Sequence, residues 1–143
     1  MQISRNISAF LKGFLNYTRI NYFSEKFNYN SSVINASKFM EYFDQIEAQK
    51  QPFQIIDLRD QYEKIILKLP SKNKKGNKVD VLPMPLRHII DKDYIEISKK
   101  KFVFLLCKGG KRAEKAQKIL DEEGYNTCVI EEGIDKIESL KLI

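Results

Sequence analysis

Residues 102–113 read FVFLLCKGGKRA, and this stretch indicates a strand, a turn and a helix in succession. Residues 102–106 have the length and the aromatic or aliphatic content of a buried β-strand, whereas residues 113–120 carry apolar side chains at helical spacing. The turn between them therefore joins a strand to a helix. Because strands alternate with helices along the rest of the chain, we expect an α/β fold in which a central parallel sheet has helices on both faces.

Cys107 lies in this turn, directly after the predicted strand. Parallel sheets bind ligands beyond the carboxyl ends of their strands, so the cysteine stands at the edge where chemistry is expected. Backbone N–H groups converge where a helix begins, and Lys108, Lys111 and Arg112 add positive charge. Both features stabilise a sulfur anion, and the turn therefore predicts a nucleophilic thiolate.

The same turn resembles the C-x-x-G-x-R-[SA] active loop of rhodanese-like domains, and the matching residues are Cys107, Gly110, Arg112 and Ala113. Residues 55–59 (IIDLR) are similar to the apolar strand of that family that ends in D-x-R. Further residues fall where the family has a helix, a turn, a strand and a terminal glycine, namely Ala116, Leu120, Gly124, Tyr125, Val129 and Gly133. The resemblance implies a rhodanese-like three-layer domain over residues 32–143.

The resemblance also implies a sulfurtransferase that works without a cofactor. Cys107 would take a sulfane sulfur from an anionic donor such as thiosulfate, hold it as a persulfide and pass it to a nucleophilic acceptor. The implied substrate-binding residues follow the cysteine, and they are Lys108, Gly109, Gly110, Lys111 and Arg112. Asp57 and Arg59, at the end of a neighbouring strand, are expected to brace the loop rather than to react.

Two alternatives stay open at this point. Phosphatases of the same fold use a loop that is one residue longer, so a phosphatase or arsenate reductase is the less favoured enzyme. The family's usual G-H-I-P-G-A stretch is replaced by residues 63–70 and a lysine-rich insertion. Two roles are therefore open, and they can coexist: an active sulfurtransferase, and a non-catalytic or vestigially catalytic rhodanese-fold accessory subunit of a large mitochondrial assembly, such as a respiratory complex, an ATP synthase or a ribosome.

Composition limits the remaining classes of function. The chain has 143 residues, a formal net charge of +6 and two cysteines, and it has no apolar run long enough to cross a bilayer. Cys128 lies in the apolar run 125–130, where a free thiol behaves as a small core residue. A single histidine, His88, and two separated cysteines offer no zinc-ligand spacing, so we predict no metal and a reducing compartment.

Positive charge is scattered rather than gathered on one stretch. After Glu25 the lysines are interleaved with acidic residues, and residues 71–78 (SKNKKGNK) have the polar, glycine-bearing profile of an exposed loop. We therefore expect no direct binding to nucleic acid.

Residues 1–31 have the composition of a basic amphipathic arm that resembles a mitochondrial targeting segment. Arg5, Lys12 and Arg19 are basic, and no acidic residue precedes Glu25. Apolar side chains would share one face of a helix, and they are Ile3, Ile7, Phe10, Leu11 and Phe14. We expect a mitochondrial protein whose arm is a targeting segment, a docking element for a protein partner or a peripheral membrane contact.

The other elements follow from apolar periodicity and from turn residues. Ser37 is the expected N-cap of a helix that ends before Pro52 and buries a stripe of Phe39, Met40, Phe43 and Ile46. The remaining expected elements are an edge strand at 32–35, strands at 53–58 and 79–82, a short helix or turn at 62–69, a helix at 91–99 and a closing helix that contains Ile134, Ile137 and Leu140.

Overall fold

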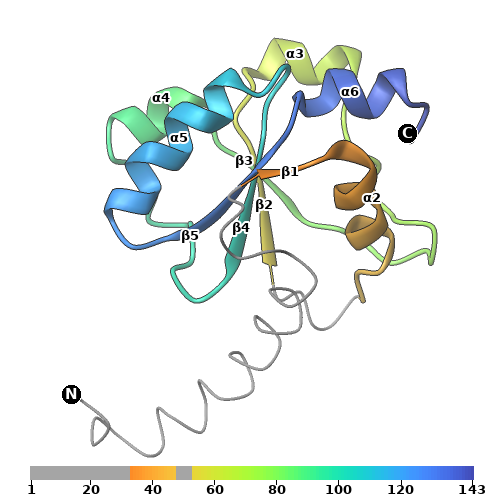
Figure 1. Ribbon diagram of the computed structural model, residues 1–143, viewed down its shortest axis with the longest axis horizontal. Helices are drawn as coiled ribbons and strands as arrows, with labels where there is room; N and C mark the ends of the chain where they lie inside the picture. The colour runs from red at the N-terminus through yellow and green to blue at the C-terminus, as the bar shows by residue number, and fades with distance from the viewer. Residues whose placement is uncertain (1–32, 48–52) are drawn as a thin grey trace, which may run out of the picture.

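The computed structural model describes residues 33–47 and 53–143, which form a five-stranded, wholly parallel sheet flanked by helices (Figure 1). The strands lie in the order β1-β5-β4-β2-β3. They are β1 (Val33–Ile34), β2 (Phe53–Asp57), β3 (Val81–Pro83), β4 (Phe102–Leu106) and β5 (Asn126–Ile130). The helices are α2 (Ala36–Asp44), α3 (Gln61–Ile66), α4 (Leu86–Ile90), α5 (Lys111–Glu122) and α6 (Gly133–Ser139). The predicted α/β class is confirmed.

Strand β4 is the centre of the sheet, and its side chains alternate between two cores. Phe104 and Leu106 belong to the core under α2 and α6, whereas Val103 and Leu105 belong to the core under α4 and α5. These four side chains are all completely buried. The continuous apolar run 102–106 therefore reflects burial on both faces, and the predicted three-layer arrangement is confirmed.

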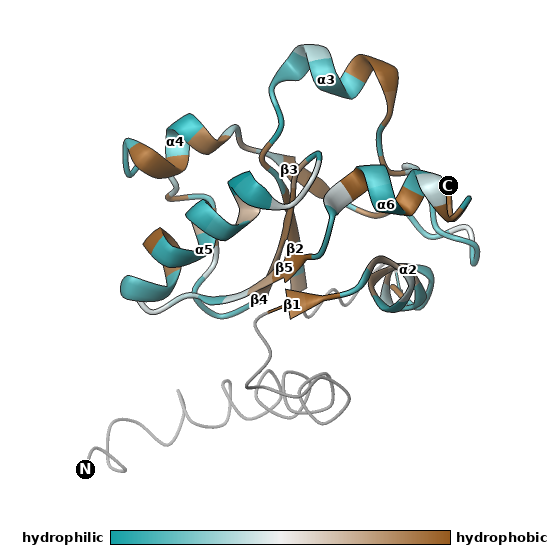
Figure 2. Cartoon of the chain, turned by 45° about the horizontal axis from the view of Figure 1, so that its top comes forward, coloured by the Kyte–Doolittle hydropathy of each residue, from teal (hydrophilic) through white to brown (hydrophobic). Residues whose placement is uncertain are grey.

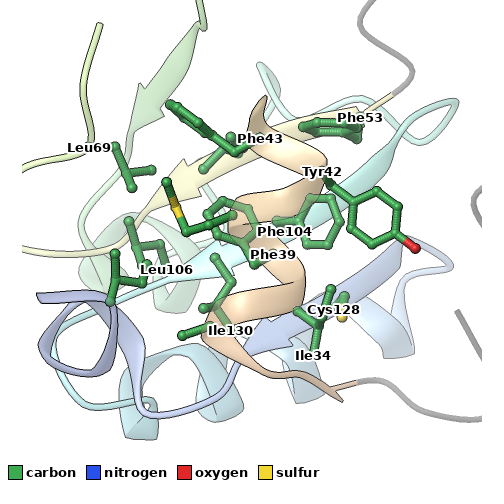
Figure 3. Close-up of a cluster of buried hydrophobic side chains, with 14 of the residues drawn as sticks. Ile34, Phe39, Tyr42, Phe43, Phe53, Leu69, Phe104, Leu106, Cys128 and Ile130 are labelled. Atoms are coloured by element: carbon green, nitrogen blue, oxygen red, sulfur yellow. The ribbon is translucent and has the colours of Figure 1, made fainter. Parts of the chain in front are cut away.

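Aromatic rings fill the core under α2 (Figure 3). The ring of Phe104 lies 5.3 Å from that of Phe39 on α2 and 5.1 Å from that of Phe53 on β2, both in edge-to-face geometry. Such contacts fix α2 against the centre of the sheet. The predicted burial of the four apolar residues is confirmed, although Ile46 lies two residues beyond the end of the helix.

The predicted N-cap of α2 is wrong by two residues. Asn35 has the extended backbone of a cap, with ψ 160°, and its side-chain oxygen accepts the Lys38 N–H at 2.8 Å. Ser37 lies inside the first turn, and the helix ends at Asp44. The predicted boundary at Pro52 lies outside the described residues, as does the whole of the predicted arm 1–31.

The helix predicted over residues 91–99 is also wrong. The helix here is α4, which ends at Ile90, and the left-handed backbone of Lys92 (φ 58°) stops it from continuing. The following turns are held from β2, because the Gln54 side chain donates to the Glu96 carbonyl at 3.1 Å and accepts the Ser98 N–H at 3.1 Å. The side chain of Gln54, which is distant in the sequence, thus fixes the backbone of residues 91–99, whose apolar residues suggested a helix.

The lysine-rich loop 71–78 is exposed as predicted, but a buried asparagine organises it. The Asn73 amide donates to the carbonyls of Phe43, in the last turn of α2, and of Ile46, just after the helix, at 3.1 and 2.8 Å. Its oxygen accepts the N–H groups of Lys75 and Asn77 within the loop. The insertion is therefore attached to the core rather than projecting away from it.

Candidate active site

Strand β4 carries Cys107 to the carboxyl edge of the sheet, in the loop that leads into α5 (Figure 1). The Leu58 N–H donates to the Leu106 carbonyl at 2.8 Å, so β4 stays paired with the segment that follows β2 up to the cysteine. Cys107 is 1% exposed, and its Sγ accepts the backbone N–H of Gly110 at 3.0 Å. The loop therefore folds back around the sulfur and directs a hydrogen-bond donor at it.

Gly110 is the loop residue whose backbone requires glycine. It caps α5 with a left-handed φ of 103°, and a Cβ there would come within 3.3 Å of the Glu132 nitrogen. Gly109 differs, since its Cβ would meet nothing within 4 Å. The turn predicted from both glycines thus depends sterically on the second.

The start of α6 closes the other side of the loop. The N–H groups of Ile134 and Asp135 donate to the carbonyls of Cys107 and Lys108 at 2.9 and 3.1 Å. Gly133 has φ 57°, and a Cβ on it would overlap both of those carbonyl groups. The Asp135 carboxylate also lies 3.2 Å from the Lys108 ammonium. The glycine noted in the sequence therefore marks the close approach of α6 to the cysteine loop.

Arg112 is held by Glu63 of α3, a residue that the sequence did not single out. Its two terminal nitrogens donate to the two carboxylate oxygens of Glu63 at 2.7 and 2.6 Å. The guanidinium hydrogen bond is the main reason why the pKa of Glu63 falls from 4.5 to about 2, and the same bond raises the pKa of Arg112. Glu63 also accepts the Asp60 N–H at 2.7 Å, which attaches the first turn of α3.

Asp57 and Arg59 form a buried pair beside this arrangement. The Arg59 Nε and Nη2 donate to the two Asp57 carboxylate oxygens at 3.0 and 2.9 Å, and Nη1 donates to the Leu67 carbonyl at 2.6 Å. The pair therefore fastens Leu67, just after α3, to the end of β2. That this pair braces the cysteine loop stays a prediction.

A groove of about 540 Å³ lies between α3 and α6 and reaches the cysteine loop at Lys108. Its other lining residues are Arg59, Tyr62, Glu63, Ile66, Leu67, Ile134, Asp135 and Glu138. The five predicted substrate-binding residues do not all lie at one place. Lys108 lines the groove, Gly110 contacts the sulfur and Arg112 binds Glu63. Gly109 is exposed on the loop, and Lys111 is exposed in the first turn of α5.

The charges around Cys107 are more nearly balanced than the sequence suggested. Glu63 neutralises Arg112, and Asp135 lies beside Lys108. The Gly110 N–H and the dipole of the twelve-residue helix α5 are therefore the fixed groups that favour a sulfur anion. Cys128, by contrast, is completely buried in the other core, and this burial raises the pKa of its thiol to about 12.

Several solved structures that are similar to this chain are rhodanese-like proteins. A rhodanese-related protein from Thermoplasma volcanium aligns at TM-score 0.57 with 23% identity, covering 75% of this chain and 91% of that one. A rhodanese-like domain protein from Staphylococcus aureus aligns at 0.55 with 20% identity, covering 71% and 86%. A rhodanese homologue from Thermus thermophilus aligns at 0.51 with 17% identity, covering 70% and 93%. No protein-family model and no curated protein matches the sequence.

The likeness covers 70–75% of this chain and 86–93% of each of these three neighbours. The chain therefore contains a domain of the rhodanese-like fold.

Proposed function

We propose that this protein is a sulfurtransferase that carries sulfane sulfur as a persulfide on Cys107. The observation that carries the proposal is the 3.0 Å hydrogen bond from the Gly110 N–H to the Cys107 Sγ, inside a loop that opens helix α5. A donor directed at sulfur favours the thiolate and, after transfer, the persulfide anion. The rhodanese-like fold of the chain supports the same chemistry.

In the first step the Cys107 thiolate attacks the outer sulfur of thiosulfate. A sulfur–sulfur bond forms to Cys107 while the bond to the sulfonate sulfur breaks, and sulfite leaves with its electron pair. In the second step a nucleophile such as cyanide attacks the outer sulfur of the persulfide. Thiocyanate leaves, and the Cys107 thiolate is restored without a net oxidation or reduction.

The residues beside Cys107 attract the donor and position the loop. Lys108 and Lys111 are exposed cations on either side of the glycines, and they attract the anionic donor. Arg112 positions the loop through Glu63, and both of its terminal nitrogens are engaged there. A phosphatase needs such a guanidinium for its phosphate, so this pairing favours sulfur over phosphate as the substrate.

The test is the formation of thiocyanate from thiosulfate and cyanide by the purified chain. We expect turnover in the wild type, its loss in Cys107→Ser and its retention in Cys128→Ala, the matched control at the second, fully buried cysteine. Equal turnover in Cys107→Ser and the wild type would overturn the proposal.

We also propose a mitochondrial location, which rests on the basic, acid-free composition of residues 1–24. A fluorescent protein fused behind residues 1–31 should colocalise with a mitochondrial stain, whereas a diffuse signal would contradict the proposal. Membership in a larger mitochondrial assembly stays a prediction. Native purification at the mass of the free chain would contradict it.

A further inference from the structure

The groove between α3 and α6 has an apolar wall and an acidic wall, and the transfer of sulfur to a small anion needs neither. We propose that it is the docking site for a polypeptide acceptor, which places an apolar side chain in the groove and a basic residue against its acidic wall while its thiol receives the sulfur. This inference rests on the proposed function, because the acceptor is the second substrate of the Cys107 persulfide.

The first observation is an apolar ridge on α3, formed by Tyr62, Ile65 and Ile66. These side chains are 68%, 83% and 87% exposed, and no residue of this helix is buried. The second half of α3, which ends in the two isoleucines, is brown in Figure 2, where α3 stands apart from the sheet and above α6. Three neighbouring large apolar side chains that stay mostly exposed are typical of an interaction surface.

The second observation is the continuity of this ridge with the cysteine loop. Tyr62 and Ile66 form one wall of the groove, and Ile134 and Lys108 also line it. Ile134 is bonded through its N–H to the Cys107 carbonyl, and Lys108 is the next residue of the loop. A chain seated in the groove is therefore held immediately beside the residue that carries the sulfur.

The third observation is the charge of the opposite wall. Asp135 and Glu138 both project from α6 into the lining. Asp135 is paired with Lys108, whereas the described residues offer the Glu138 carboxylate no ion pair. A peptide with an apolar side chain and an arginine or lysine can pack against the apolar wall and pair with the acidic one. A small anion such as cyanide can do neither.

The transfer itself balances in the same way as the assay reaction. The acceptor thiolate attacks the outer sulfur of the Cys107 persulfide, a new sulfur–sulfur bond forms on the acceptor, and the Cys107 thiolate leaves. The acceptor ends as a persulfide, and neither an oxidant nor a reductant is consumed.

The experiment measures the discharge of preloaded Cys107 persulfide by synthetic peptides with a single cysteine. One peptide has leucines and arginines beside the cysteine, the second has serines in place of the leucines, and the third has glutamates in place of the arginines. Rate constants are compared at equal thiolate concentration and divided by the rate constant for cyanide. We expect the leucine–arginine peptide to exceed both others about tenfold.

Two variants locate the preference on the protein. Ile66→Ser and Glu138→Gln should each reduce the peptide-to-cyanide ratio several-fold, because Ile66 lines the apolar wall and Glu138 the acidic one. The matched controls, Ile95→Ser and Glu122→Gln, replace an isoleucine that is 91% exposed and an exposed glutamate, both outside the groove, and should keep the ratio.

The outcomes separate the two proposals. If thiosulfate loads no persulfide, the proposed function fails and the acceptor site fails with it. If the persulfide forms but the three peptides react equally, or if Ile66→Ser leaves the ratio unchanged, the acceptor site alone is overturned. A dimer in sedimentation that Ile66→Ser dissociates would assign the ridge to a second copy of the chain and would likewise overturn it.

Discussion

Glu63 holds Arg112 through two hydrogen bonds, of 2.6 and 2.7 Å, across 49 residues of sequence. The pair joins α3, on the chain that follows β2, to the first turn of α5, which follows Cys107. The arginine of the cysteine loop is therefore a positioning residue here. Its carboxylate partner lies on a helix that has no buried side chain of its own.

Glu63→Gln should destabilise the protein by about 1–3 kcal/mol at neutral pH, since it removes the charged partner of a partly buried arginine. Urea unfolding followed by circular dichroism measures the change. Glu41→Gln is the matched control, because Glu41 is exposed and forms only a surface pair with Lys38 on α2. A loss no larger than that of the control would contradict the account.

The stabilisation from Glu63 should depend on pH in a defined window. The folded protein lowers the pKa of Glu63 from 4.5 to about 2, so the stabilising charge is fully present above about pH 4.5 and is lost as the pH falls towards 2. The difference in unfolding free energy between the wild type and Glu63→Gln should therefore shrink over this range. A difference that stays constant from pH 6 to pH 2 would show that the charge is not responsible.

Gly133→Ala should destabilise the protein far more than Gly109→Ala. A Cβ at position 133 would overlap the carbonyl groups of Cys107 and Lys108, and its backbone has φ 57°, whereas a Cβ at position 109 meets nothing within 4 Å. We expect a loss of more than about 1 kcal/mol in the first variant and a small change in the second. Thermal unfolding of the two single variants measures the two losses of stability. Equal melting temperatures would be inconsistent with the close approach of α6 to the cysteine loop.

Removal of one member of the buried Asp57–Arg59 pair should cost more than removal of both. Arg59→Met leaves the carboxylate of Asp57, a residue 5% exposed, without its partner, so we expect a loss of about 3–5 kcal/mol. Adding Asp57→Asn to that variant should recover part of the loss. A double-mutant cycle in urea measures the coupling, and strictly additive losses would refute the pairing as a source of stability.

The sequence predicted most of the local structure at the site and little of its long-range pairing. Cys107 and Gly110 could be identified because the strand, the turn and the helix are contiguous in the chain. The partner of Arg112 could not, because D-x-x-E at Asp60 and Glu63 reads as a local helix cap and indicates nothing about a residue in a distant segment. The same reason hid the contact of Asp135 with Lys108.

The errors in the fold have a similar origin. Tyr94 and Ile97 are buried, so the segment from 91 to 99 carried the apolar spacing of a helix. Its backbone is fixed instead by the side chain of Gln54, on a strand that precedes it by about forty residues. The role of Asn73 could not be predicted from the sequence either. Only the position of α2 in the fold shows that the Asn73 amide meets two buried carbonyls.

The most direct test of sulfur transfer through Cys107 is intact-protein and peptide mass spectrometry of the folded chain after treatment with thiosulfate. We predict a mass increase of one sulfur atom that maps to Cys107, disappears on addition of cyanide and is absent from Cys107→Ser. A folded wild-type protein that acquires no such sulfur, or that acquires it on Cys128 instead, would contradict the claim that Cys107 is the sulfur carrier.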